Sequence, residues 1–295
     1  MIHTCRVRVL ALVISAVAGI ATAGTAGAGV DEFDAPQTTR LPPPLAHFTG
    51  QDALAAIFPS YRIGHSAIRE IPSDDAGSTH VGFAEAKPWR ANGGNFVIVR
   101  FEIGTFKRYG IKLCYPCLEE DGLAVLDERA GRMHVVAQAY GNNDTAPIIQ
   151  AGIDDIWLDL APYRFDARET LVGVRQIHTS GPGAEFEEML SLFRVIGSRL
   201  VTVGRLPLSA ARVRPEDDSL DREEAVVIVS ARPGGGANDL LVRSRITRCA
   251  FARHAARFAC EPAHRPVLIR DWASERYRYA KGNYNRIGRT VTHLP

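Results

Sequence analysis

The sequence predicts a mainly β protein, an antiparallel meander of hairpins arranged as a propeller, a sandwich or a large barrel, with one short helix near its N-terminus. Three observations support this prediction. Apolar residues recur at a period of two over many short segments, which is typical of half-buried strands. Glycine-containing turn sequences separate those segments. Only one segment, close to residue 50, has the capping and composition of a helix.

The chain begins with a predicted export signal, residues 1–28. Arg6 and Arg8 form its positive end, the apolar run 9–20 follows, and small residues mark a cleavage site after it. We therefore expect a mature protein in the periplasm or secreted from the cell. The apolar run is shorter than the roughly 20 residues that a membrane span needs, so we expect no membrane span.

Loss of Arg6 and Arg8 with the signal takes the formal net charge from +2 to zero. A protein without excess positive charge has no general attraction to nucleic acid, and we expect no such partner. Tyrosines alternate with arginines between Arg276 and Arg286, a pattern that could stack on single strands. A terminal hairpin with tyrosines inward and arginines outward explains the same residues.

Residues 29–47 contain four prolines and no periodicity, which predicts an extended leader. A helix should follow, with Thr49 as its N-cap, and end at Pro59. The β-rich domain then occupies the remainder of 48–295. The charged stretch 211–224 predicts a long surface loop, and any subdivision of the domain would fall there.

The strands are predicted from alternation, most clearly over 95–103, where Val97, Val99, Phe101 and Ile103 share one face. Turns should lie at 130–131, 196–198, 233–236 and 281–283. The predicted strands, in chain order, are 95–103, 122–126, 133–139, 156–160, 171–178, 189–196, 200–205, 225–230, 240–247, 258–260 and 267–272.

The mature chain keeps four cysteines, Cys114, Cys117, Cys249 and Cys260, and an exported protein keeps such thiols as disulfides. Cys249 and Cys260 flank a predicted hairpin that a bridge would close, which leaves Cys114 to pair with Cys117. A redox dithiol and a four-cysteine metal site are the alternatives. We favour structural disulfides, because the acidic residues after Cys117 would raise the pKa of a reactive thiol.

The best candidate for a functional loop is 176–185. It brings His178 and Ser180 close together at a strand end, and Gly181 and Gly183 allow the backbone to approach a partner closely. A plain hairpin turn, a binding loop and a Ser-His nucleophile remain alternatives. A nucleophile would need an orienting acid and an oxyanion hole, and no Gly-x-Ser-x-Gly elbow is present. We assign no catalytic residue, metal ligand or cofactor.

Several segments together resemble a family of proteins. The segments are Cys114-Tyr-Pro-Cys117, Leu171-Val-Gly-Val-Arg175 with Ser180-Gly181, the run 190–195 and the closing Tyr277-Arg-Tyr-Ala-Lys-Gly-Asn-Tyr284. Together they resemble uncharacterised exported β-rich proteins of Gram-negative bacteria, and this resemblance implies an exported β fold.

The loop Ser180-Gly181-Pro182-Gly183 is also similar to the beginning of the Ser-Gly-x-x-Tyr loop of periplasmic lysozyme inhibitors, with Ala184 in place of the tyrosine. That resemblance implies a loop that plugs the cleft of a wall-degrading enzyme. We therefore expect a non-enzymatic binding protein with a protein partner in the cell envelope, such as an inhibitor or immunity protein against a wall-active enzyme. The alternative is a secreted hydrolase that uses His178 and Ser180.

Overall fold

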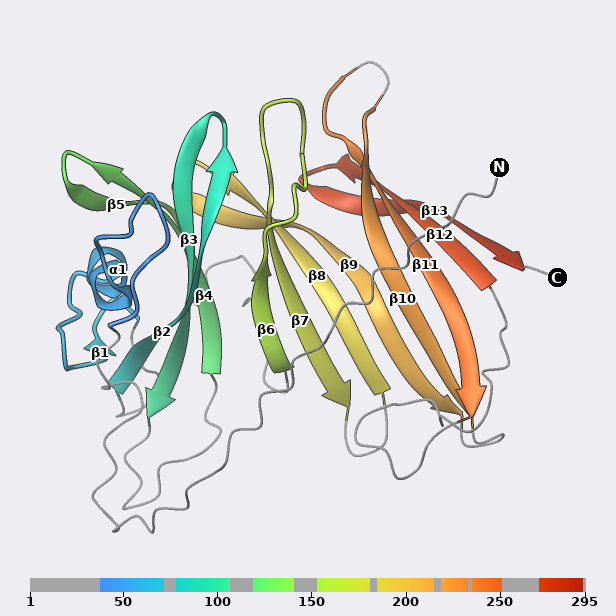
Figure 1. The fold of residues 1–295 in the computed structure, drawn as a ribbon, viewed down its shortest axis with the longest axis horizontal. Helices are drawn as coiled ribbons and strands as arrows, with labels where there is room; N and C mark the ends of the chain where they lie inside the picture. The colour runs from blue at the N-terminus through green and yellow to red at the C-terminus, as the bar shows by residue number, and fades with distance from the viewer. Residues whose placement is uncertain are drawn as a thin grey trace, which may run out of the picture. The chain divides into compact units, whose positions relative to one another are not determined.

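The computed structural model describes residues 38–71, 78–106, 119–140, 153–180, 185–214, 219–232, 235–250 and 271–293. All of them belong to one compact unit, Glu32–Pro295. The described part is mainly β, with thirteen strands and a single short helix (Figure 1). The mainly β fold with one N-terminal helix, predicted from periodicity, is confirmed.

The helix and the first strands are α1 (Gly50–Ile57), β1 (Ala67–Ile68), β2 (Ser78–Ala91), β3 (Gly94–Phe106), β4 (Glu119–Arg129), β5 (Arg132–Ala139) and β6 (Ile153–Asp159). The remaining strands are β7 (Val172–Ser180), β8 (Glu185–Ile196), β9 (Arg199–Arg214), β10 (Ser219–Ser230), β11 (Asp239–Ala250), β12 (Asp271–Ala280) and β13 (Asn283–His293).

The helix begins and ends where its sequence predicts. Asp52 N–H donates to the Thr49 hydroxyl, and the Asp52 carboxylate accepts from Thr49 N–H at 2.8 Å, which forms a capping box. Pro59 follows the C-cap Phe58. The apolar face of α1 packs on the sheet through Leu54, which is fully buried.

Neighbouring strands pair in the order β1-β2-β3-β4-β5-β9-β10-β11-β12-β13, and β6, β7 and β8 form a branch that joins at β9. All pairings are antiparallel except β5 with β9, which share a single parallel register at Gln138 and Arg199. The path runs from β1 to β13 without closing into a barrel. Consecutive strands are thus mostly hairpin neighbours, as a meander requires.

The sheet β2–β5 is buried on both faces. One face packs against α1 and contains Val97, Val99 and Phe101, whereas the other contains Ile98 and packs on β6–β9. Phe101 lies opposite Gly122 on β4, and its ring occupies the space that a side chain there would need. A ring packed over a cross-strand glycine stabilises such a pairing.

The branch β6–β9 is also covered on both faces. Leu190, Ser191, Leu192 and Phe193 are consecutive residues of β8, and all four are buried. Phe193 faces the core shared with β2–β5, while Leu190 and Leu192 face a third core shared with β11–β13. A strand between two layers carries a continuous apolar run instead of alternation, which explains this segment.

The outer edge of β6 is closed by side chains from β2. The Glu85 carboxylate accepts from Leu158 N–H at 2.8 Å, and the Lys87 ammonium donates to Leu158 C=O at 2.6 Å. Glu85 and Lys87 are also paired with each other at 2.7 Å. Two backbone groups that a strand edge would leave unpaired are therefore satisfied.

Strands β9 and β10 pair only over a short stretch. The ladder runs from Ser219 opposite Arg214 to Glu224 opposite Ser209. Beyond Glu224 the two strands diverge (Figure 1), and β10 continues to Ser230 paired with β11 alone. Its 225–230 segment is thus a sheet edge.

This pairing overturns one expectation. The stretch 211–224 was predicted as a surface loop, but residues up to Arg214 belong to β9 and residues from Ser219 belong to β10. Cross-strand pairs such as Asp221 opposite Arg212 place opposite charges side by side, so the charged residues stabilise strands here.

The leader prediction is wrong for its second half. Leu41 and Leu45 are buried in the core around α1, and Leu41 N–H donates to Phe48 C=O. These two leucines are spaced four apart among prolines, so no periodic pattern marked them. Residues 29–37 lie outside the described part of the chain.

The remaining strand predictions are mostly confirmed, with longer bounds in the structure. Strands β1, β2 and β13 and most of β12 were not among the predicted strands, because β1 has only two residues, Pro88 interrupts β2 and alternating charges mask β12. The predicted 258–260 strand and residues 267–270 of the predicted 267–272 strand lie outside the described residues. The terminal hairpin of β12 and β13 is confirmed, with Tyr277 and Tyr284 buried and Arg276 and Arg286 exposed.

Candidate functional site

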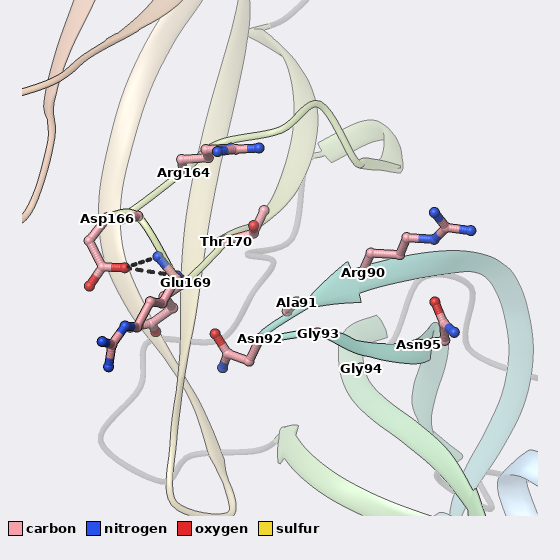
Figure 2. A pocket seen from close by; sticks show the side chains of 12 residues that line it. Arg90, Ala91, Asn92, Gly93, Gly94, Asn95, Arg164, Asp166, Glu169 and Thr170 are labelled. Atoms are coloured by element: carbon pink, nitrogen blue, oxygen red, sulfur yellow. Dashed lines mark hydrogen bonds between the residues drawn. The ribbon is translucent and has the colours of Figure 1, made fainter.

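A cavity of about 480 Å³ opens between the β2–β3 turn and the loop that joins β6 to β7 (Figure 2). The sequence does not suggest this site, because its two halves are some seventy residues apart. Its lining residues are Arg90, Ala91, Asn92, Gly93, Gly94, Asn95, Arg164, Asp166, Ala167, Arg168, Glu169 and Thr170.

The β2 side of the cavity is a tight hairpin. Asn92 and Gly93 both have positive φ, at 52° and 77°, which is the backbone of the two-residue turn that antiparallel strands favour. The turn places Arg90 directly opposite Asn95, so their side chains leave the same face of the hairpin. Figure 2 shows both side chains at this side of the opening.

The opposite side is a loop closed by its own hydrogen bonds. Asp166 accepts from the backbone N–H groups of Arg168 at 2.7 Å and Glu169 at 2.8 Å (Figure 2). Phe165 N–H donates to Glu169 C=O at 2.8 Å, and Arg164 bridges to Thr170. The short polar Asp side chain thus replaces a backbone turn.

Aromatic side chains at alternate positions anchor the loop in the core. Tyr163 and Phe165 point into the third core, and Phe165 meets Tyr279 edge to face at 4.7 Å. The guanidinium of Arg194 lies over the Phe165 ring at 4.1 Å. The residue between the two aromatics, Arg164, is therefore held at the surface, where it lines the cavity.

The acidic residues of the lining are already engaged. Glu169 accepts two hydrogen bonds from Arg194, both at 2.8 Å, in the bidentate geometry of a strong pair. The hydrogen bonds from Arg168 N–H and Glu169 N–H hold the pKa of the Asp166 carboxyl below its usual range. Asp166 thus accepts hydrogen bonds from within the loop, and Glu169 accepts its hydrogen bonds from Arg194 on β8.

Three arginines of the lining differ in this respect. Arg90, Arg164 and Arg168 have no ion-pair or hydrogen-bond partner for their guanidinium groups among the residues that the structure describes. Arg164 and Arg90 extend from opposite sides of the opening (Figure 2). Planar guanidinium forks match carboxylate and phosphate oxygens, so the cavity is suited to an anionic group.

A polar network below the loop fixes its first residues. Asp159 accepts from Ala161 N–H at 3.0 Å, from the Tyr163 hydroxyl at 2.8 Å and from Arg175 Nε at 2.5 Å, and Arg175 also pairs with Glu188. Burial of the hydroxyl and its bond to Asp159 raise the pKa of Tyr163. The tyrosine therefore remains a donor at all ordinary pH values.

Of the predicted binding residues, His178 and Ser180 lie at the C-terminal end of β7, and neither lines the cavity. His178 is exposed on β7 and its backbone pairs opposite Glu187. The side chain of Ser180 and the whole of Gly181 and Gly183 lie outside the described residues. None of these four residues is in the lining of the cavity, and the binding role of the loop stays a prediction.

Most of the cysteines also lie outside the described residues. Cys114, Cys117 and Cys260 lie outside the described residues, and only the backbone of Cys249, opposite Leu220 in β11, is described. No disulfide is seen within the described part. The two expected bridges therefore stay predictions.

A second group of polar side chains lies where β1 meets β2. The His80 ring contacts the Ser66 hydroxyl through Nδ1 and the Ser78 hydroxyl through Nε2, each at 2.6 Å. Ser66 is buried, whereas Ser78 is exposed. An exposed hydroxyl on an imidazole that a further group orients is the arrangement of an activated nucleophile.

The described residues include no group of three or more His, Cys, Asp or Glu side chains placed to hold a metal ion. Among them, too, no helix has the length and apolar character needed to cross a membrane. Comparisons of the chain with family models, curated proteins and solved structures found no match.

Proposed function

We propose that this protein is a non-enzymatic binding protein that works in the periplasm or outside the cell and holds an anionic group of its ligand in the arginine cavity. One observation carries the proposal: Arg90, Arg164 and Arg168 line one cavity, and among the described residues their guanidinium groups have no hydrogen-bond or ion-pair partner, while the acids beside them accept hydrogen bonds from other groups. Guanidinium groups that line one opening can accept the oxygens of a carboxylate or phosphate.

The frame around the arginines favours binding over catalysis. The turn at Asn92 and the loop closed by Asp166 are both held by local backbone geometry and hydrogen bonds. Such a frame loses little conformational entropy when a ligand enters, which strengthens binding. The two carboxylates of the lining that could act as a nucleophile or base, Asp166 and Glu169, are already engaged in hydrogen bonds.

The partner that we propose is a protein of the cell envelope, with a wall-active enzyme as the favoured class. Enzymes that cleave wall glycans work with a pair of carboxylates in a cleft, so acidic side chains surround their substrate site. An acidic side chain from such a partner has the chemistry that the three arginines accept.

The cavity is tested by calorimetric titration of the mature protein with citrate, a tricarboxylate probe. We expect saturable binding that weakens with salt, and Arg90→Gln and Arg164→Gln should each weaken it about tenfold, as loss of a bidentate charge-assisted pair does. Arg205→Gln is the matched control, because Arg205 is an exposed arginine that does not line the cavity. Equal affinity in all four proteins would refute the site.

The partner class is tested separately, by adding the protein to lysozyme and following lysis of a cell-wall suspension. Inhibition that Arg164→Gln removes and Arg205→Gln retains would support an inhibitor. Citrate binding without any effect on lysis would leave the cavity in place and exclude this enzyme as the partner.

A hydrolase is the second candidate, and the Ser78–His80 contact is the observation that favours it. The Ser78–His80 pair is a separate candidate from His178 and Ser180, whose catalytic role stays a prediction. Hydrolysis of p-nitrophenyl acetate that Ser78→Ala abolishes and Ser198→Ala retains would support an enzyme. Equal rates in the two variants would exclude Ser78 as a nucleophile.

Export itself is part of the proposal. Sequencing the N-terminus of the protein from a periplasmic fraction should show that residues up to about 28 are absent. Peptide mass mapping without reductant should then link Cys249 to Cys260 and Cys114 to Cys117. Free thiols at all four positions in the exported protein would contradict the disulfide prediction.

A further inference from the structure

The strands β10, β11 and β12 have an outer face, which is turned away from the third core. Their inner face contains Leu240, Val242 and Tyr277, which are buried in that core. Side chains alternate along a strand, and residues directly opposite each other share a face, so the residues of the outer face follow from the register. Its three cross-strand rows are Glu224-Arg245-Trp272, Val226-Arg243-Ser274 and Ile228-Leu241-Arg276. We call these nine residues the arginine–tryptophan face.

Three arginines stand on this face without an anionic partner. Arg243 and Arg245 lie two residues apart on β11, and Arg276 lies diagonally from Arg243 on β12, so neighbouring positions are about 7 Å apart. All three are exposed. Among the residues that the structure describes, none of them makes a hydrogen bond or an ion pair through its guanidinium group. Guanidinium groups at this spacing can donate to the oxygens of several phosphates at once.

The acids at the border of the face are engaged by other arginines. Asp239 accepts two hydrogen bonds from Arg278, at 3.0 and 3.1 Å. Glu224 pairs with Arg222 at 2.7 Å. Each of these pairs cancels in charge, so the charge of the face is that of its three unpaired arginines. A second copy of the same face would bring like charges together, which is unfavourable, so the face is suited to an anionic partner.

Exposed apolar side chains lie beside these arginines. Trp272 is 39% exposed and lies directly opposite Arg245. Val226 is 59% exposed and lies directly opposite Arg243, and Ile228, two residues further along β10, is 39% exposed. Single exposed apolar residues are ordinary on a protein surface, but several that gather on one face among cations indicate an interaction surface.

We propose that the arginine–tryptophan face binds the surface of a membrane that contains anionic phospholipids. In this arrangement the three arginines lie against the lipid phosphates, to which basic side chains are attracted. The Trp272 ring and the side chains of Val226 and Ile228 enter the boundary between the headgroups and the acyl chains. Tryptophan is favoured at that boundary, because its ring is apolar while its indole N–H still donates a hydrogen bond.

The composition of the face favours lipid over nucleic acid, the other common polyanion that arginines bind. Surfaces for single-stranded nucleic acid stack successive bases on aromatic side chains. Trp272 is the one aromatic residue among the nine of this face, and the remaining apolar residues, Val226, Ile228 and Leu241, are aliphatic. Aliphatic side chains provide no stacking platform, but they bury apolar area in a bilayer surface. None of the nine residues lines the arginine cavity, so this inference is independent of the proposed function.

The first test measures sedimentation of the mature protein with vesicles. We expect binding to vesicles of phosphatidylglycerol and phosphatidylcholine in equal parts, weakened by salt, and no binding to phosphatidylcholine alone. Arg243→Gln and Arg245→Gln should each lower the partition coefficient about fivefold, as loss of one basic side chain at an anionic surface does. Arg132→Gln is the matched control, because it removes an exposed arginine of β5. Absence of binding, or equal binding by all four proteins, overturns the proposal.

The second test identifies the surface that enters the bilayer and does not depend on the charge variants. Lipids brominated on their acyl chains quench the fluorescence of a tryptophan that reaches them. Quenching of the wild-type protein should be lost in Trp272→Phe and kept in Trp157→Phe, the matched control, since Trp157 lies on β6 and is not part of the face. Quenching that persists in Trp272→Phe would show that another surface enters the bilayer, which contradicts the proposal.

A fluorescent single-stranded oligonucleotide tests the other polyanion. We expect it to bind more weakly than the anionic vesicles at the same salt concentration, because the face offers one aromatic ring for stacking. Oligonucleotide binding that Arg243→Gln weakens, in a protein that does not sediment with vesicles, would assign the face to nucleic acid and overturn the proposal.

Discussion

Two strand edges of this molecule differ in whether their outward backbone groups have hydrogen-bond partners. At β6, Glu85 and Lys87 from β2 bond to both backbone groups of Leu158, so the edge is closed within the chain. At β10, residues 225–230 pair with β11 on one edge, and no described strand pairs with their other edge. The comparison shows that side chains from a distant strand can satisfy the backbone groups of one edge, while another edge of the same fold is left without such contacts.

The two regions also differ in how their faces are covered. Strands β3, β4 and β8 lie between two layers, and consecutive residues such as Leu192 and Phe193 are buried. From Asp221 to Ser230, strand β10 alternates between half-buried and exposed residues. Substitutions should therefore cost much more stability in the first region than in the second.

The largest effect is expected from Leu192→Ala. This side chain is fully buried in the third core, and its truncation should lower the free energy of unfolding by about 3 kcal/mol. Val226→Ala, on the exposed face of β10, should change it by less than about 0.5 kcal/mol. Urea denaturation followed by circular dichroism checks both. Similar losses in the two variants would contradict the two-layer account of β8.

A smaller loss is expected at the closed edge. Glu85→Ala removes the acceptor of Leu158 N–H and should lower the free energy of unfolding by about 2 kcal/mol, since a half-buried donor loses its partner. Glu224→Ala removes only an exposed pair and should cost less than about 0.5 kcal/mol. If Glu85→Ala cost no more than Glu224→Ala, the edge would not be closed in solution.

The smallest effect concerns pH. Burial raises the pKa of Asp159, but hydrogen bonds from Ala161 N–H, Arg175 and Tyr163 outweigh it, so its pKa lies below the ordinary value of 3.8. A lowered pKa contributes stability above the unfolded value that is lost as the pH falls through the folded one. Asp159→Asn should cost about 1 kcal/mol at pH 7, and the difference from wild type should shrink below about pH 4.

Thermal unfolding from pH 7 to pH 3 checks this dependence. Glu187→Gln is the control, since Glu187 is an exposed carboxylate on the neighbouring strand β8. A gap between Asp159→Asn and wild type that stays constant down to pH 3 would mean that the hydrogen bonds to Asp159 do not favour its charged form.

Local signals accounted for much of the fold. Thr49 and Asp52 predicted the helix start, and the glycine turns at Gly131 and Gly282 predicted two hairpins, because these features depend on residues close in sequence. Prediction failed where a distant contact decides the outcome. The charges of 211–224 indicated a loop, yet pairing between β9 and β10 makes most of that stretch strand.

The candidate site was missed for the same reason. Arg90 and Arg164 carry no motif, and they share a cavity because the β2–β3 turn comes to lie against the loop after β6. The one local signal was the alternation Tyr163-Arg164-Phe165-Asp166 outside a predicted strand. It could have indicated an anchored loop with two outward polar residues.

The amino-acid sequence by itself determined the mainly β class, the capped helix and most hairpins, because capping, turn geometry and pleat act over a few residues. Only the tertiary structure decided which strands are covered on both faces, which edge is closed and which arginines share a cavity. These depend on contacts between segments far apart in the chain, such as Glu85 with Leu158. Periodicity records that a residue is buried or exposed, but it does not record the element that covers it.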